Sequence, residues 1–461
     1  MMELRSAAGR IDRVDLVSVA AVAAAAVIGL GIVVSPLVSL ALAAALFAIP
    51  LLVSPIARVA FVVVGGMAVL NVSEALSVPK IAYLVGCILV VGVAWVRLPV
   101  LREGAAYARL RPVLRMSFVL ASFVVIEAAV AIGAGALASQ ALREASSYLL
   151  FACAPLVALD AYSSSRPHVL AVTFVCITVL GTLSYAIQWV TVRGFADISL
   201  TRLSLAGALP AALLSFLSAG FMFGRRRVLW ALGAGAVLAL LFVTGNRASL
   251  TALLGPLAIV LLSGHGRWKR VATFALIVPL VVISAFISLR YVATVFDIDT
   301  YAIATRYESL LDPRGLRRDY SVQIRLSQTR AAATVFRDNL VMGAGPGYRF
   351  TWINPFTGLA ESYTTIDSPM QFPAKFGLVG VVTMLGLLGA YAAMFARMNR
   401  TPGLYLAATI GFAVTQIVDA LIQHPPIDDK GFTIAFIMLL ALSLPTREPR
   451  SAEVPAEEIS G

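Results

Sequence analysis

The sequence predicts an all-α polytopic membrane protein, with about 12–14 transmembrane helices and one large exterior loop that contains an amphipathic helix. Hydrophobic residues make up 60% of the 461 positions and charged residues only 13%, whereas soluble domains carry about 25% charged residues. Apolar runs of near-spanning length follow one another along the chain. A single long polar interval, residues 290–376, interrupts them.

Residues 1–289 form the predicted N-terminal transmembrane region. Its first apolar run, 16–34, follows Arg5, Arg10 and Arg13 as in a signal peptide, but no convincing cleavage site follows it, so it is expected to remain as the first helix. A span needs about 20 apolar residues, so about twelve spans are expected if the shortest runs are re-entrant. The other runs lie at 37–53, 57–71, 81–96, 116–136, 146–160, 167–188, 204–223, 228–244, 248–263 and 271–289.

Residues 377–446 form the predicted C-terminal transmembrane region, with apolar runs at 377–396, 402–420 and 431–445. The remaining segment, 447–461, is rich in acidic residues and is expected to be a disordered cytoplasmic tail.

The placement of basic residues predicts the orientation. With a cytoplasmic N-terminus, the cytoplasmic segments hold 20 basic residues and the short exterior segments hold six. This bias places residues 290–376 outside and both termini inside. The net charge of +12 therefore indicates membrane-anchoring arginines, and no nucleic-acid partner is expected. The three cysteines, Cys87, Cys153 and Cys176, lie in apolar runs and are expected to be packing residues.

The exterior interval contains ten of the 36 basic residues and eight acidic residues. Its densest part predicts an amphipathic helix that carries its arginines on the solvent side and ends at Asn339. Gly343, Gly345 and Gly347 then indicate a turn, because they lack the lysine of a phosphate-binding loop and follow no strand pattern. The apolar face of the helix is expected to consist of Val322, Leu326, Thr329, Ala333 and Phe336.

Three arginines are candidate ligands for a diphosphate. Arg247 lies in a tight reversal between two apolar runs at the predicted outer face, and Arg325 and Arg330 lie on the amphipathic helix. A guanidinium group can grip a diphosphate through two parallel hydrogen bonds. The alternative is that Arg247 only extends from a helix end to the interface and that the other two are solvated surface charges.

Two carboxylates are candidates for a general base. Asp367 lies where the exterior segment returns to the membrane, next to the expected position of a lipid-borne substrate, and Glu361 precedes it closely. An aspartate before Ser-Pro is also typical of a turn or helix cap. His424 with Asp428 and Asp429 could instead form a metal site, although a connecting loop explains these residues as well.

Glu127 stands apart from these residues, because it lies in the middle of an apolar run. An ionisable group at that depth faces a cavity or a partner and is a candidate for function. No nucleotide-phosphate loop is visible, so an enzyme working on the exterior face would need a substrate that arrives already activated. A lipid-linked diphosphate sugar meets this need.

Three segments, in this order, resemble the O-antigen ligase and polysaccharide polymerase superfamily. They are Thr244-Gly-Asn-Arg247-Ala248, the run from Arg325 through Asn339 to Gly343-Ala-Gly345-Pro-Gly347, and Asp367-Ser368 followed by Gly377-Leu-Val-Gly380. Asp367 stands where the ligases of this superfamily carry histidine, so the chain is more similar to the polymerases.

The resemblance implies a membrane glycosyltransferase of the bacterial cytoplasmic membrane. Its partners would be a polyprenyl-diphosphate-linked glycan and a saccharide acceptor, with no cofactor. Arg247 and Arg325 would bind the donor diphosphate, Arg330 and Glu361 would be further substrate-binding residues, and Asp367 would be the base. Because arginines meet the diphosphate charge, metal independence is expected. The alternative from another class is a transporter or flippase of a lipid-linked substrate, which Glu127 as a proton-coupling group would favour.

Overall fold

The computed structural model describes residues 51–62, 78–164, 167–191, 208–243, 251–262, 320–398, 403–422 and 430–444, with short pieces between 269 and 287. Almost all of these residues are helical, and the sheet is a single two-stranded hairpin. The predicted first helix, the cytoplasmic tail, Arg247, His424, Asp428 and Asp429 lie outside the described residues.

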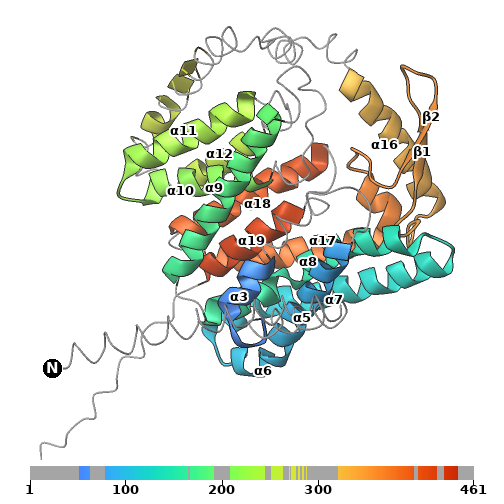
Figure 1. Ribbon diagram of the computed structural model, residues 1–461, viewed down its shortest axis with the longest axis horizontal. Coiled ribbons are helices and arrows are strands. Elements are labelled where there is room, and N and C mark those ends of the chain that lie inside the picture. Colours follow the sequence, from blue (N-terminus) through green and yellow to red (C-terminus); the bar gives the residue numbers. More distant parts are fainter. Residues whose placement is uncertain are drawn as a thin grey trace, which may run out of the picture.

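The described helices confirm an all-α polytopic membrane protein (Figure 1). Four are long and apolar enough to cross a membrane: α7 (Ala105–Gly133), α8 (Ala138–Ser164), α17 (Gln371–Met398) and α18 (Leu404–Ile422). Each coincides with a predicted apolar run. The structure also describes the apolar helices α5 (Val78–Val96), α9 (Pro167–Thr191), α10 (Ala208–Phe223), α11 (Arg227–Val243), α12 (Leu254–Leu262) and α19 (Lys430–Ser443), and two short pieces, α3 (Pro55–Ala60) and α6 (Leu98–Leu101).

Helix α8 is the central helix of the bundle. Within its apolar window 78% of the residues are buried, against 39% in α7, so α8 packs against protein on most sides while α7 exposes an apolar face as expected for contact with lipid. It forms an antiparallel hairpin with α7 and also packs on α19, while α17 crosses α7. A second group, in which α10 contacts α11, α12 and α18, lies on the other side of α19 (Figure 1).

A buried ion cluster marks one end of α8. Arg58 is 1% exposed, and its Nε donates to Asp160 Oδ2 over 2.7 Å, while Arg97 forms a second salt bridge to the same carboxylate. Arg58 also donates to the carbonyl oxygens of Leu51 and Leu52. Because charges buried away from water require such partners, this cluster ties α3, α5 and α8 together at that end.

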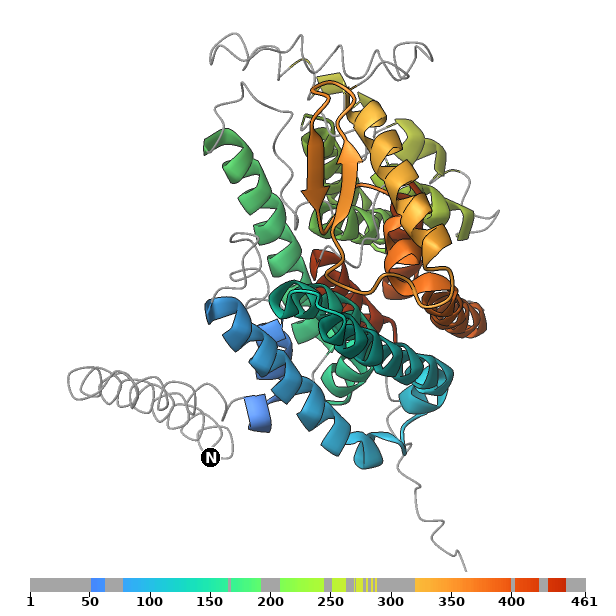
Figure 2. The same cartoon turned by 90° about the vertical axis from the view of Figure 1, so that its right-hand side faces the viewer.

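The described part of the polar segment, residues 320–376, forms a small unit at the other end of α7 and α8 (Figure 2). It consists of α16 (Tyr320–Asp338), then β1 (Phe350–Ile353) and β2 (Ala360–Tyr363), before α17 begins. The two strands are antiparallel, with Phe350 opposite Tyr363. A loop was expected where this hairpin lies. The hairpin forms because Phe350 and Trp352 alternate with exposed residues and pack toward α16, and because Asn354 Oδ1 accepts the Phe356 N–H and closes the turn.

Helix α16 lies where the amphipathic helix was expected, and Val322, Thr329 and Phe336 of its predicted face are partly buried, but the predicted face was wrong in part. Gln328 and Ala332 are buried, whereas Leu326 is 45% exposed and Ala333 is also exposed. The packed face contains polar side chains because they form hydrogen bonds to the chain around Ser368. The spacing of hydrophobic residues cannot predict such hydrogen bonds. Arg325 consequently lies on the packed face, and Arg330 lies on the solvent side as predicted.

Helix α17 is broken at Gly377, where φ is 60° and ψ is −167°. An unbroken helix would bond the N–H groups of residues 378 and 379 to the carbonyl groups of residues 374 and 375. Here the turn after α16 replaces both bonds: Leu378 and Val379 donate to Leu340 and Val341, and Ala344 and Gly345 donate to Ala374 and Lys375, all at 2.9–3.1 Å. The predicted boundary between residues 376 and 377 thus falls at a real break in the helix.

Candidate functional site

Arg325 and Asp367 meet at the end of the helix bundle. Arg325 Nε lies 3.9 Å from Asp367 Oδ2, and the two side chains are 25% and 17% exposed. A cation and a carboxylate, far apart in sequence, are therefore brought together in a partly buried position that water and a substrate can still reach. Electrostatic interactions are stronger there than on the open surface.

The α16 helix fixes the position of both groups. Gln328, one turn after Arg325, accepts the backbone N–H of Asp367 with its Oε1 at 3.0 Å. The hydroxyl groups of Thr329 and Ser368 form a hydrogen bond of 2.9 Å. Since residues three and four apart share a helix face, the face that carries Arg325 also holds the backbone on both sides of the Asp367 carboxylate.

Ser368, next to Asp367, makes the turn contact that leads into α17. Its Oγ accepts the Met370 N–H at 3.1 Å, and its carbonyl oxygen accepts the Gln371 N–H at 3.1 Å. Gln371 Oε1 in turn accepts the Ile366 N–H at 2.6 Å. The carboxylate of Asp367 lies within ion-pair distance of Arg325. These contacts of the turn are made by its neighbour Ser368.

Of the other predicted site residues, the two that the structure describes, Arg330 and Glu361, do not join this pair. Arg330 is exposed on α16. Glu361 lies on β2, where its Oε1 accepts a hydrogen bond of 2.7 Å from Asn354 Nδ2, so it stabilises the turn of the hairpin. Arg247 lies outside the described residues, and Thr251, four positions after it, bonds to Asp419 near the end of α18 over 3.5 Å.

A buried ion pair between α8 and α17 was not predicted. Lys375 Nζ lies 2.6 Å from Glu144 Oε2, and the two side chains are 1% and 6% exposed. Glu144 Oε2 also accepts the Gly347 N–H at 2.7 Å, and Lys375 donates to the Thr364 carbonyl at 2.5 Å. The available signal was that Lys375 stands inside an apolar stretch, where a charge requires a partner.

The glycine turn packs against the connected end of the α7–α8 hairpin, where α7 ends and α8 begins. Gly343, Gly345 and Gly347 have φ angles of 84°, 82° and 85°, which side-chain-bearing residues rarely adopt. A Cβ atom on Gly345 would lie 2.7 Å from that of Ala131, and one on Gly347 would lie 2.9 Å from the Ala141 nitrogen. These glycines are therefore required for close packing, and the predicted turn is confirmed.

Glu127 is buried on α7, one turn before Ala131, with 2% of its surface exposed. Its Oε1 atom has no hydrogen-bond partner within the described residues. Glu127 lies near Gly345, and Glu144 bonds to Gly347, so two buried acidic residues lie next to the glycine turn.

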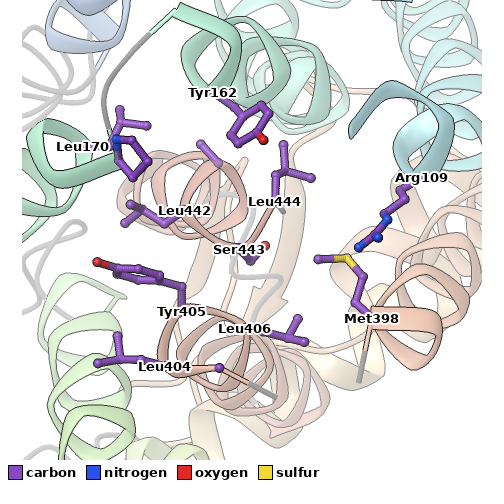
Figure 3. Close-up of a pocket in the computed structure, with 13 residues that line it drawn as sticks. Arg109, Tyr162, Leu170, Met398, Leu404, Tyr405, Leu406, Leu442, Ser443 and Leu444 are labelled. Carbon is purple, nitrogen blue, oxygen red and sulfur yellow. The ribbon is translucent and has the colours of Figure 1, made fainter. Parts of the chain in front are cut away.

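A cavity of about 330 Å³ lies at the opposite end of the same helices (Figure 3). It is lined by Arg109 at the start of α7, Tyr162 near the end of α8, Met398 at the end of α17 and Ser443 at the end of α19. All these helix ends are predicted to lie on the cytoplasmic side of the membrane, whereas Arg325 and Asp367 are predicted to lie on the outer side. The cavity is therefore separate from the candidate site.

Within the described ranges, no three His, Cys, Asp or Glu residues lie close enough together to hold a metal ion. A comparison of the chain with models of known protein families found no match, and a search of curated proteins found none either.

Proposed function

We propose that this protein is a membrane glycosyltransferase of the polysaccharide polymerase type. It transfers a glycan from a polyprenyl diphosphate donor to a hydroxyl group of a saccharide acceptor at the outer face of the bacterial cytoplasmic membrane. The observation that carries the proposal is the 3.9 Å approach of Arg325 and Asp367 at the end of a bundle of membrane helices. A diphosphate leaving group needs a cation, and an acceptor hydroxyl needs a base, and this pair supplies both.

Each residue has a distinct role in this proposal. Arg325, together with Arg247, binds the diphosphate and stabilises the negative charge that develops as the bond from the sugar to the phosphate oxygen breaks. Asp367 takes the proton of the acceptor hydroxyl as its oxygen attacks the anomeric carbon. Before the donor binds, the arginine is paired with the carboxylate, and the incoming diphosphate competes for the guanidinium and frees Asp367 for the acceptor.

Depletion of the protein in the cells that make it tests this function. A polymerase predicts that lipid-linked single repeat units accumulate, whereas a ligase predicts long lipid-linked polymers. An Arg325→Ala variant at normal abundance should reproduce the same accumulation. No change in lipid-linked glycans after depletion would reject the proposal. Transfer by the purified protein in detergent should also survive EDTA, because guanidinium groups meet the diphosphate charge.

A transporter of a lipid-linked substrate is the second candidate, and the burial of Glu127 favours it. The two functions differ in where the intermediate accumulates. After loss of a transporter the lipid-linked glycan stays on the cytoplasmic face, but after loss of an exterior transferase it reaches the outer face. Digestion of spheroplasts with an added glycosidase separates the two cases, because only glycan on the outer face is cleaved.

A further inference from the structure

The buried pair of Glu144 and Lys375 contacts the β1–β2 hairpin at both of its ends. Glu144 holds the Gly347 N–H, just before β1 begins, and Lys375 holds the Thr364 carbonyl, just after β2 ends. The Lys375 ammonium also lies 5.5 Å from the centre of the Phe350 ring, the first residue of β1. One ion pair between α8 and α17 thus contacts the two chain segments at the open end of the β1–β2 hairpin.

Helix α8 adds a further contact to the same point. Arg143, adjacent to Glu144, donates from Nη2 to the Thr364 hydroxyl at 3.3 Å. Thr364 is therefore bonded to the helix bundle through its carbonyl and its side chain. Asp367 follows only three residues later, so its backbone is fixed on one side by this anchor and on the other by α16.

We propose that Glu144 and Lys375 are positioning residues that hold Asp367 at its working distance from Arg325. The pair touches neither group directly. It acts by fixing Gly347 and Thr364 to α8 and α17, so the short stretch from Thr364 to Asp367 starts from a point that is held to the bundle. The kinetic part of this inference rests on the proposed function, but the structural part does not.

A double variant separates positioning from mere stability. Glu144→Gln and Lys375→Met each leave one buried group without its charged partner and should lower the unfolding temperature. Combining Glu144→Met with Lys375→Met removes both charges and keeps similar volume, which commonly restores much of the stability lost when an ion pair is broken. The double variant still lacks the bonds to Gly347 and Thr364, so the positioning of Asp367 should remain lost.

Hydrogen exchange gives a readout that does not depend on activity. The amides of Gly347, Ile366 and Asp367 are hydrogen-bonded in the folded protein. In the double variant their exchange should rise about tenfold or more, while exchange in α10 and α18 stays as in the wild type. Asp160→Asn is the matched control, because it disrupts an equally buried pair at the other end of α8 and should leave the three amides unchanged.

Turnover is measured with the lipid-linked glycan purified from depleted cells. The double variant should lose about 100-fold in kcat, because small displacements of reacting groups have effects of that size. Its affinity for the donor should stay within about threefold, because Arg325 still binds the diphosphate. The Asp160→Asn control should keep its kcat.

Recovery of kcat together with stability in the double variant would overturn the proposal, as would unchanged exchange at the three amides. If the wild-type protein transfers no glycan while the double variant does accelerate exchange, the proposed function fails and the anchoring of Asp367 stands.

Discussion

The packed position of Arg325 separates it from the other arginines of α16. Arg330 and Arg337 are exposed, and Arg337 pairs only with its neighbour Asp338 over 3.4 Å. Surface pairs of this kind contribute little to stability. Arg325, in contrast, is only 25% exposed and lies 3.9 Å from Asp367.

Substitution by lysine therefore tests whether Arg325 grips a diphosphate with its planar group. Arg325→Lys keeps the charge but loses the paired hydrogen bonds, so transfer should fall even though the protein folds. Alanine should reduce it further, by about 2 kcal/mol or more in activation free energy. Arg337→Lys is the control and should be neutral. Equal rates of transfer for Arg325→Lys and the wild type would contradict paired hydrogen bonds from Arg325 to the diphosphate.

Sequence alone could identify Arg325 and Asp367 as candidates, because polar groups that can do chemistry are few in so apolar a chain. It could not predict that they meet. Their approach depends on the rotation of α16, which is set by Gln328 and Thr329 bonding to the chain around Ser368. The pairing of Glu144 with Lys375 was equally hidden, because 231 residues separate them.

At the scale of elements, the break in α17 joins the site to the membrane helices. The four backbone bonds between residues 340–345 and 374–379 give partners to the N–H groups of residues 378 and 379 and to the carbonyl groups of residues 374 and 375 at the break. The glycines are evident in the sequence, but the reason for Gly377 is not. It is required because the backbone of Val341, more than thirty residues earlier, packs directly against it. The hairpin was missed because its strands have only four residues each.

A glycine substitution tests the break. Gly377→Ala should destabilise the protein by about 3 kcal/mol or more, because φ is positive and the new Cβ would lie 2.2 Å from the Val341 carbonyl oxygen. Gly389→Ala in the same helix meets no atom within 4 Å and should be neutral or slightly stabilising. Thermal unfolding in detergent measures both. A variant Gly377→Ala as stable as the wild type would contradict the break as a required feature.

At the scale of the whole molecule, the helix ends separate into two sides. The described part of the polar segment lies at the junction of α7 and α8, and the cavity lies where α7 begins and α8 and α17 end. This separation agrees with the alternation that the apolar runs predict. The bias of basic residues predicts the direction of the bundle across the bilayer.

Labelling with a membrane-impermeant maleimide checks the direction. In a background without native cysteines, Thr357→Cys at the hairpin turn should react in intact spheroplasts, and Glu103→Cys before α7 should react only after lysis. Both positions are exposed. The reverse pattern would place Arg325 and Asp367 on the cytoplasmic side, where no lipid-linked donor awaits transfer to an exterior polymer.

The most direct test of the account is the substitution Asp367→Asn. Asparagine keeps the shape of the side chain and can fill a turn, but it cannot accept a proton at neutral pH. With donor purified from depleted cells, turnover should fall by at least about 100-fold while donor binding stays close to normal, because Arg325 still meets the diphosphate. Turnover near the wild-type rate, in a variant of normal abundance and stability, would contradict the assignment of Asp367 as the base.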